Sequence, residues 1–315
     1  VGILLLPATQ YPATTWWSKP DLDREYVLSL DVEHYFGNIQ KMRKHLETDR
    51  QILWVTYYRN LYNATHPSEI NSPVSLSRNL LAWNQPGTNG LILPVNPSAS
   101  FLSILFANEL WFTLGDMTMA EHCAMLSMIF SPRNSGSRMI KRLAEINLVN
   151  GDDEAALKYL RILDKTLLHK SWAEKRIPGQ QTPRVKEWLE KKRRDIPTQD
   201  QLRSGNDAVT SLRNLVASNA GNLRAYEYLL CYHLLSKDLR SFVEDYVPGK
   251  VSSPIFAEAL LIHLARQGNI RAEELIKYQI PVEIAKEFAD YTRIYEAKDT
   301  SLKEKYGKTY WFYYH

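Results

Sequence analysis

The residues with the most reactive side chains in this sequence are not spaced for a known reaction. Gly307-Lys308-Thr309 resembles the end of a phosphate-binding loop, but Leu302 stands where such a loop needs its first glycine. The eight histidines include no His-Glu-x-x-His pair, so no metal site is predicted. Cys231 and His233 could form a nucleophile and base, although a packed thiol on an apolar helix is the favoured interpretation. The sequence therefore predicts no catalytic residue and no cofactor.

One group of charged residues could bind a ligand. Residues at spacings of three, four and seven lie on one stripe of a helix, and such a stripe here carries Arg138, Lys141, Arg142 and Glu145. Three cations facing a groove could hold a carboxylate or an acidic peptide. A later helix has a similar set in the same relative place: Arg224, Glu227 and Tyr228. A solvated helix face is the favoured alternative. The binding hypothesis fails if these cations are buried in salt bridges with neighbouring helices.

The helices that carry the first set belong to an internal repeat. Gly115-Asp116 and Gly151-Asp152 each separate two apolar-periodic segments, at an offset of 36 residues (151 minus 115). Ala120 and Ala156 are equivalent at the same offset. A small residue after the turn allows two antiparallel helices to approach closely. Repeats of this length and pattern predict an all-α, tetratricopeptide-like array of helical hairpins, an α-solenoid, with a long irregular insertion.

The rest of the chain divides around this repeat. We expect six segments: 1–20 an amino-terminal lead, 21–62 a first helical hairpin plus a helix, 63–96 the irregular insertion, 97–168 the central repeats, 169–205 a polar connector with a basic helix, and 206–315 carboxy-terminal repeats and a cap. The basic helix, 184–194, is interpreted as a solvated face with Val185, Trp188 and Leu189 turned inward. The terminal aromatic residues are expected to cover the last hairpin.

Composition limits the possible partners. The chain has 315 residues, of which 44% are hydrophobic and 23% charged, which suits a water-soluble protein with a large core. A net charge of +4 is too small to predict nucleic-acid binding. Cys123 and Cys231 are expected to be buried thiols. The apolar run at residues 1–7 is too short to cross a bilayer and is expected to be the remnant of an upstream segment or an ordinary buried stretch.

Several longer runs resemble a known family. These are NLLAWNQPGTNGLILP, RMIKRLAEINLVNGDDEAALKYLRILDKTL, NLRAYEYLLCYHLLSKDLRSF and GKTYWFYYH. From about Asn79 onward, the chain resembles the carboxy-terminal region of a family of uncharacterised bacterial membrane-associated proteins. The resemblance implies transmembrane helices upstream of a soluble tetratricopeptide-like region, and hence membrane association of the full-length form. The family has no assigned activity, so the resemblance implies no catalytic residue.

Two functions follow as hypotheses. The first is a non-enzymatic scaffold that binds a peptide or a partner protein in a concave groove, tethered to a membrane through an upstream segment. The second is a glycan-binding or hydrolytic module with its site under the 63–96 insertion, where aromatic and amide side chains suit sugars: Trp83, Asn84 and Gln85. The array itself favours the scaffold, because a repeat specifies a surface and no reaction.

Overall fold

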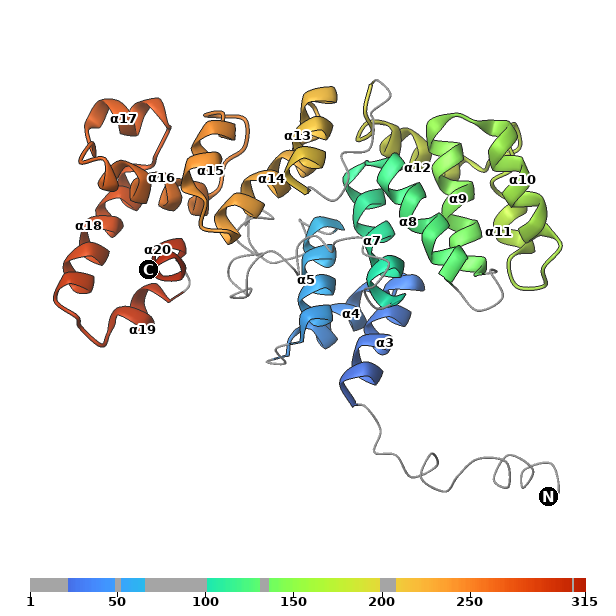
Figure 1. The fold of residues 1–315 in the computed structure, drawn as a ribbon, viewed down its shortest axis with the longest axis horizontal. Coiled ribbons are helices and arrows are strands. Elements are labelled where there is room, and N and C mark those ends of the chain that lie inside the picture. The colour runs from blue at the N-terminus through green and yellow to red at the C-terminus, as the bar shows by residue number, and fades with distance from the viewer. Residues whose placement is uncertain (1–21, 49–51, 66–100, 131–135, 199–207, 308) are drawn as a thin grey trace, which may run out of the picture. The chain divides into compact units, whose positions relative to one another are not determined.

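The fold is helical throughout the part of the chain that the structure describes. The computed structural model describes residues 22–48, 52–65, 101–130, 136–198, 208–307 and 309–315 (Figure 1). Within these ranges the regular elements are all helices and there is no strand, which confirms the all-α prediction. The chain divides into two compact units, Val1–Tyr58 and Arg59–His315, and each is described on its own.

The first unit is built on the hairpin of α3 (Leu22–Tyr35) and α4 (Ile39–Leu46). Gly37, with φ of 70°, reverses the chain between the two helices. The hairpin buries Val27 and Leu30 of α3 against the apolar side of α4. Tyr58, from α5 (Leu53–Thr65), donates a hydrogen bond to Asp31 Oδ1 over 2.5 Å. This bond links α5 to α3 within the unit.

The second unit begins with the two repeated hairpins. The first pairs α7 (Phe101–Leu114) with α8 (Met117–Phe130), and the second pairs α9 (Ser137–Asn150) with α10 (Asp153–Asp164). Gly115 and Gly151 both adopt positive φ, 95° and 81°, at the turns. α8 also packs on α9, so the two hairpins are neighbours in space (Figure 1). The predicted helix pairs and their turns are therefore correct.

The connector after α10 contains α11 (Lys170–Glu174) and α12 (Pro183–Arg193). α12 packs against α9, with Val185 and Leu189 buried and Trp188 half-buried, as predicted. Arg193 donates to the carbonyl oxygens of Leu148 and Val149 at distances of 2.8 and 3.1 Å. Because these carbonyls lie in the last turn of α9, where no intrahelical donor remains, α12 caps the end of that helix.

The rest of the unit continues as packed helices. In order these are α13 (Ala208–Ser218), α14 (Leu223–Leu235), α15 (Leu239–Asp245), α16 (Pro254–Arg266), α17 (Ala272–Lys277), α18 (Val282–Glu296), α19 (Leu302–Tyr306) and α20 (Tyr310–Tyr314). Along most of this stretch each helix packs on its predecessor, and α16 also packs on α18 and α20.

The terminal aromatic residues cover α16, as the sequence predicted. Tyr310 N donates to Glu258 Oε2 over 2.6 Å, and Trp311 Nε1 donates to the Glu258 carbonyl over 3.0 Å. The Tyr310 hydroxyl donates to the carbonyl of Leu234 at the end of α14. Tyr310 and Trp311 are 1% and 0% exposed, so this last short helix closes the apolar end of the unit.

Two of the expected segments, the amino-terminal lead and the insertion, lie wholly or almost wholly outside the described residues. Residues 1–20 lie outside the described residues, and so does the expected insertion beyond Thr65, including Trp83, Asn84 and Gln85. α5 runs to Thr65, so helix replaces the first three residues of the expected insertion. Among the helices that the structure describes, none combines the length and the apolar character needed to cross a membrane.

Candidate functional site

The predicted cations of α9 meet a carboxylate of α7. Arg138 Nη2 lies 3.1 Å from Glu109 Oε1, and Arg142 Nη2 lies 2.5 Å from Glu109 Oε2. The Arg138 and Arg142 side chains are only 17% and 12% exposed. The groove hypothesis therefore needs correction, because both guanidinium groups are held in salt bridges with a neighbouring helix.

Arg142 joins equivalent residues of the two repeats. Glu109 and Glu145 differ by the repeat offset of 36 (145 minus 109). Arg142 contacts both carboxylates, with Nη1 3.0 Å from Glu145 Oε2, and its Nε donates to Asn108 Oδ1 over 3.0 Å. Such charge-assisted bonds fix the guanidinium between α7 and α9.

The Phe112 ring contacts side chains of both α9 and α12. The Arg142 Cζ atom lies 3.8 Å from the ring centroid, and Lys192 Nζ of α12 lies 4.6 Å from it. Trp188, one turn earlier on α12, stacks on the same ring with centroids 6.2 Å apart. An aromatic ring attracts cations through its negative face. Phe112 therefore brings a cation from α9 and one from α12 close together.

Lys192 lies near two arginines and two carboxylates of the site. Its ammonium donates to the Phe112 carbonyl oxygen over 3.2 Å. Burial, together with the charges of Arg224 and Arg142, lowers its pKa to about 8, and Asp195 and Glu145 only partly compensate. The sequence interpretation of this helix as a solvated face holds for exposed neighbours such as Lys191 and fails for Lys192.

α14 supplies the third cation. Arg224 Nη1 lies 3.4 Å from Asp195 Oδ2 and donates to the Thr113 carbonyl oxygen over 3.2 Å. Asn222, which precedes α14, donates through Nδ2 to the carbonyls of Leu114 and Asp195, both over 2.7 Å. These bonds dock the start of α14 on the end of α7. We refer to Arg142, Lys192 and Arg224 together as the cationic cluster.

The remaining predicted site residues are Glu227, Tyr228 and Lys141, and they have different surroundings. Burial raises the pKa of Glu227 to about 7, and the Arg224 charge opposes that shift. Tyr228 is 0% exposed, so it belongs to the core and is removed from the predicted groove. Lys141 lies elsewhere, with Nζ 4.8 Å from the Trp172 ring centroid, and the Arg176 guanidinium is 4.0 Å from the same ring.

The reactive side chains of Cys231, His233 and Glu258 are buried or hydrogen-bonded within the fold. Cys123 and Cys231 are buried, as predicted. His233 Nε2 lies 2.7 Å from Asp245 Oδ2, and Cys231 is 0% exposed, so the pair offers no accessible nucleophile. Glu258 anchors the terminal aromatic helix. Among the described residues there is no group of three or more histidine, cysteine or acidic side chains arranged to hold a metal ion.

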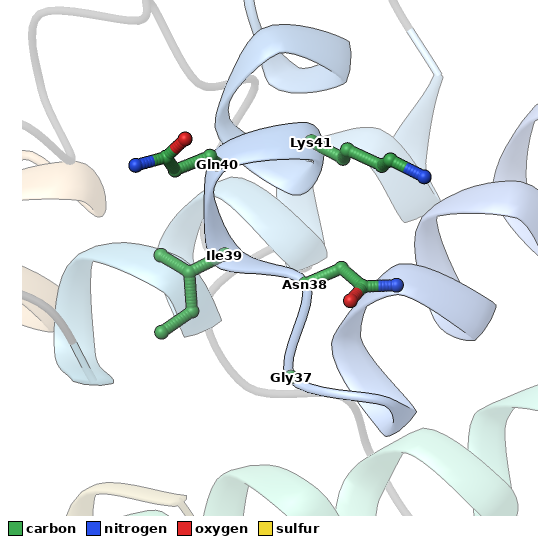
Figure 2. Close-up of a pocket in the computed structure, with 5 residues that line it drawn as sticks. All are labelled: Gly37, Asn38, Ile39, Gln40 and Lys41. Carbon is green, nitrogen blue, oxygen red and sulfur yellow. The ribbon is translucent and has the colours of Figure 1, made fainter.

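A surface hollow in the first unit does not have the features of a site. It is a depression of about 310 Å³ lined by the consecutive residues 37–41, at the turn before α4. Figure 2 shows the Gln40 and Lys41 side chains pointing away from each other, with Asn38 and Ile39 also on opposite sides. Because no polar groups converge, the hollow lacks the arrangement that fixes a ligand.

The sequence analysis did not single out two residues of this site, Glu109 and Lys192. Of these, Glu109 could have been identified. Glu109 is the repeat equivalent of Glu145, so the offset that identified the hairpins also identifies it. Lys192 could not be separated from the other lysines of its helix, because its burial depends on how α12 packs against α7 and α9. Periodicity along one helix does not contain that information.

The fold and site are those of an all-helical protein with a half-buried cluster of cations. A model for a family of unknown function (DUF6057) matches residues 1–315, and the chain belongs to that family. Comparisons with curated proteins and with solved structures give no match.

Proposed function

We propose that this protein is a non-enzymatic interaction scaffold that binds an acidic segment of a partner protein at the cationic cluster. The observation that carries the proposal is the environment of Lys192. Lys192 is half-buried, and burial together with the charges of Arg224 and Arg142 lowers its pKa to about 8. A partner carboxylate bound there would relieve this repulsion and gain charge-assisted hydrogen bonds.

The architecture supports a scaffold role. Repeated hairpins packed on their neighbours, as α7 to α10 are, present a long surface made of many helices. We propose that the repeated hairpins are of the tetratricopeptide-like, α-solenoid type and that the full-length form is membrane-tethered. In this proposal the ligand contacts α12 and α14, whereas Arg138 and Arg142 of α9 hold Glu109.

The accessible edge of the cluster determines how a partner would enter. Arg224 and Asp195 are 27% and 25% exposed, whereas Arg142 is 12% exposed. The Arg224–Asp195 pair is also the longest of these contacts, at 3.4 Å. A ligand carboxylate would therefore replace Asp195 on Arg224 first and then reach Lys192.

The test is a peptide selection with matched variants. Immobilised protein selects from a random peptide display library, and the enriched peptides are measured by fluorescence anisotropy. We expect Asp- and Glu-rich sequences whose affinity falls about tenfold in Lys192→Gln. The exposed neighbour Lys191 gives the control, since Lys191→Gln removes the same charge from the same helix and should bind as the unmodified protein does.

Two results would contradict the proposal. One is enrichment with no acidic preference, and the other is equal loss of affinity in both lysine variants, which would indicate diffuse attraction to a basic helix. Lys192→Gln should fold normally, because it removes a charge that the folded state disfavours. A thermal melt of each variant verifies this before binding is measured.

A further inference from the structure

Two leucines in the turn between α10 and α11 are almost fully exposed. The relative exposure of Leu167 is 97% and that of Leu168 is 85%. Single exposed apolar side chains are common on protein surfaces, but two adjacent leucines at this exposure are a costly arrangement in water. Ile162, in the last turn of α10, is also half exposed. The turn therefore presents apolar side chains that the described part of the fold does not use.

The turn is held in this conformation by hydrogen bonds. The Thr166 hydroxyl donates to the Leu163 carbonyl over 2.7 Å and accepts from His169 N over 3.2 Å. Lys170 N donates to the Thr166 carbonyl over 3.2 Å, while Leu163 is 0% exposed and anchors the end of α10. These bonds fix the backbone of the turn that carries both leucines. Their exposure is thus built into the local structure.

Basic side chains flank the leucines on both sides. Arg161, Lys165, Lys170 and Lys175 are exposed, whereas the carboxylates in the same stretch are Asp164, which is half-buried, and Glu174. Lys170 and Glu174 lie 3.9 Å apart at 60% and 52% exposure, a loose pair that leaves the ammonium available to other anions. The apolar pair is therefore surrounded by excess positive charge.

We propose that the Thr166–His169 turn is a membrane-surface contact, in which both leucines enter the headgroup region of an anionic bilayer and the flanking cations bind lipid phosphates. Apolar side chains flanked by lysine and arginine match such a surface in both hydrophobicity and charge. A protein partner fits less well, because a stable interface needs about 800 Å² on each side. The contact is independent of the cationic cluster.

Vesicle co-sedimentation of the 315-residue chain tests the proposal. Vesicles of phosphatidylcholine alone are compared with vesicles containing about 30% phosphatidylglycerol. We expect stronger binding to the anionic vesicles, falling about tenfold or more in the variant carrying Leu167→Ser and Leu168→Ser. Lys165→Gln with Lys170→Gln should weaken binding to the anionic vesicles several-fold and reduce its salt dependence.

Two controls make the result specific. Ile276, at 77% exposure on α17, provides Ile276→Ser, which removes an exposed apolar side chain elsewhere and should bind vesicles normally. Lys192→Gln should also bind normally, so failure here and failure of the proposed function can be told apart. The proposal is overturned if the double serine variant binds anionic vesicles as well as the unmodified chain. It is equally overturned if no vesicle binding occurs and sedimentation velocity shows a leucine-dependent dimer instead.

Discussion

The turns of the two central hairpins have the same local structure in different surroundings. In both, a glycine with positive φ is followed by an aspartate whose Oδ1 accepts the N–H of the residue three positions later, at 2.8 Å in Asp116 and 2.9 Å in Asp152. This bond satisfies one of the unpaired N–H groups at the start of a helix. The alanines four residues after the aspartates, Ala120 and Ala156, are both 0% exposed.

The two turns differ in how closely the returning chain approaches the glycine. A Cβ atom at Gly115 would lie 2.2 Å from the Asp195 carbonyl oxygen, whereas one at Gly151 would meet nothing within 4 Å. Asp116 is 8% exposed and Asp152 is exposed. The repeat thus specifies the hairpins, and the site arises where α12 packs on α9 and the start of α14 docks on the end of α7.

The largest predicted difference is between alanine substitutions of the two glycines. Gly151→Ala should lower the free energy of unfolding by about 1 kcal/mol, since only the left-handed conformation is penalised. Gly115→Ala adds a backbone clash and should cost about 3 to 4 kcal/mol. Urea denaturation of both variants measures this. Equal losses would show that the docked segment moves away without cost, contrary to the comparison.

The next difference is between the equivalent glutamates. Glu109→Gln leaves Arg138 and Arg142 without their shared carboxylate in a mostly buried position, and we expect a loss of about 2 to 3 kcal/mol. Glu145→Gln removes a more exposed contact of Arg142 and should cost about 1 kcal/mol or less. Urea denaturation at low and high salt measures both. A greater loss for Glu145→Gln would reverse the assignment of Glu109 as the central carboxylate.

The smallest difference concerns the pH dependence of the two aspartates. Burial raises the pKa of Asp116 to about 6, and the hydrogen bond from Met119 N partly opposes the shift. Between about pH 4 and 6 the folded state therefore binds more protons than the unfolded state, so this group's contribution to stability falls as the pH rises. Asp116→Asn keeps an oxygen to cap α8 and lacks this dependence. Relative to the unmodified protein, it should gain about 1 to 2 kcal/mol from pH 4 to pH 7.

Asp152→Asn provides the control for that measurement. Its position is exposed, so the same substitution at the second turn tests whether the pH dependence follows burial. Thermal melts across the range measure both variants. A pH dependence of equal size at the two turns would contradict the assignment of burial as the cause.

The hairpins could be predicted from the sequence because their signals are local. The Gly-Asp turns, the apolar periods and the small residues at 120 and 156 all lie within one repeat, and the structure has helices where they indicate them. The site could be predicted only in part. Arg142 and Arg224 were identified by their spacing along a helix. Their proximity to Lys192 depends on tertiary packing between segments some 30 to 80 residues apart.

The pKa of the Lys192 ammonium group tests the central claim most directly. It can be measured by NMR titration of the protein with ¹³C-labelled lysine Cε, assigned with Lys192→Gln, in the absence and presence of a selected acidic peptide. We predict a value of about 8 for the protein alone, and a rise when the peptide's carboxylates bind beside it. A pKa near 10.5, the ordinary lysine value, in both samples would contradict the account, because Lys192 would then be neither buried nor affected by the charges of Arg224 and Arg142.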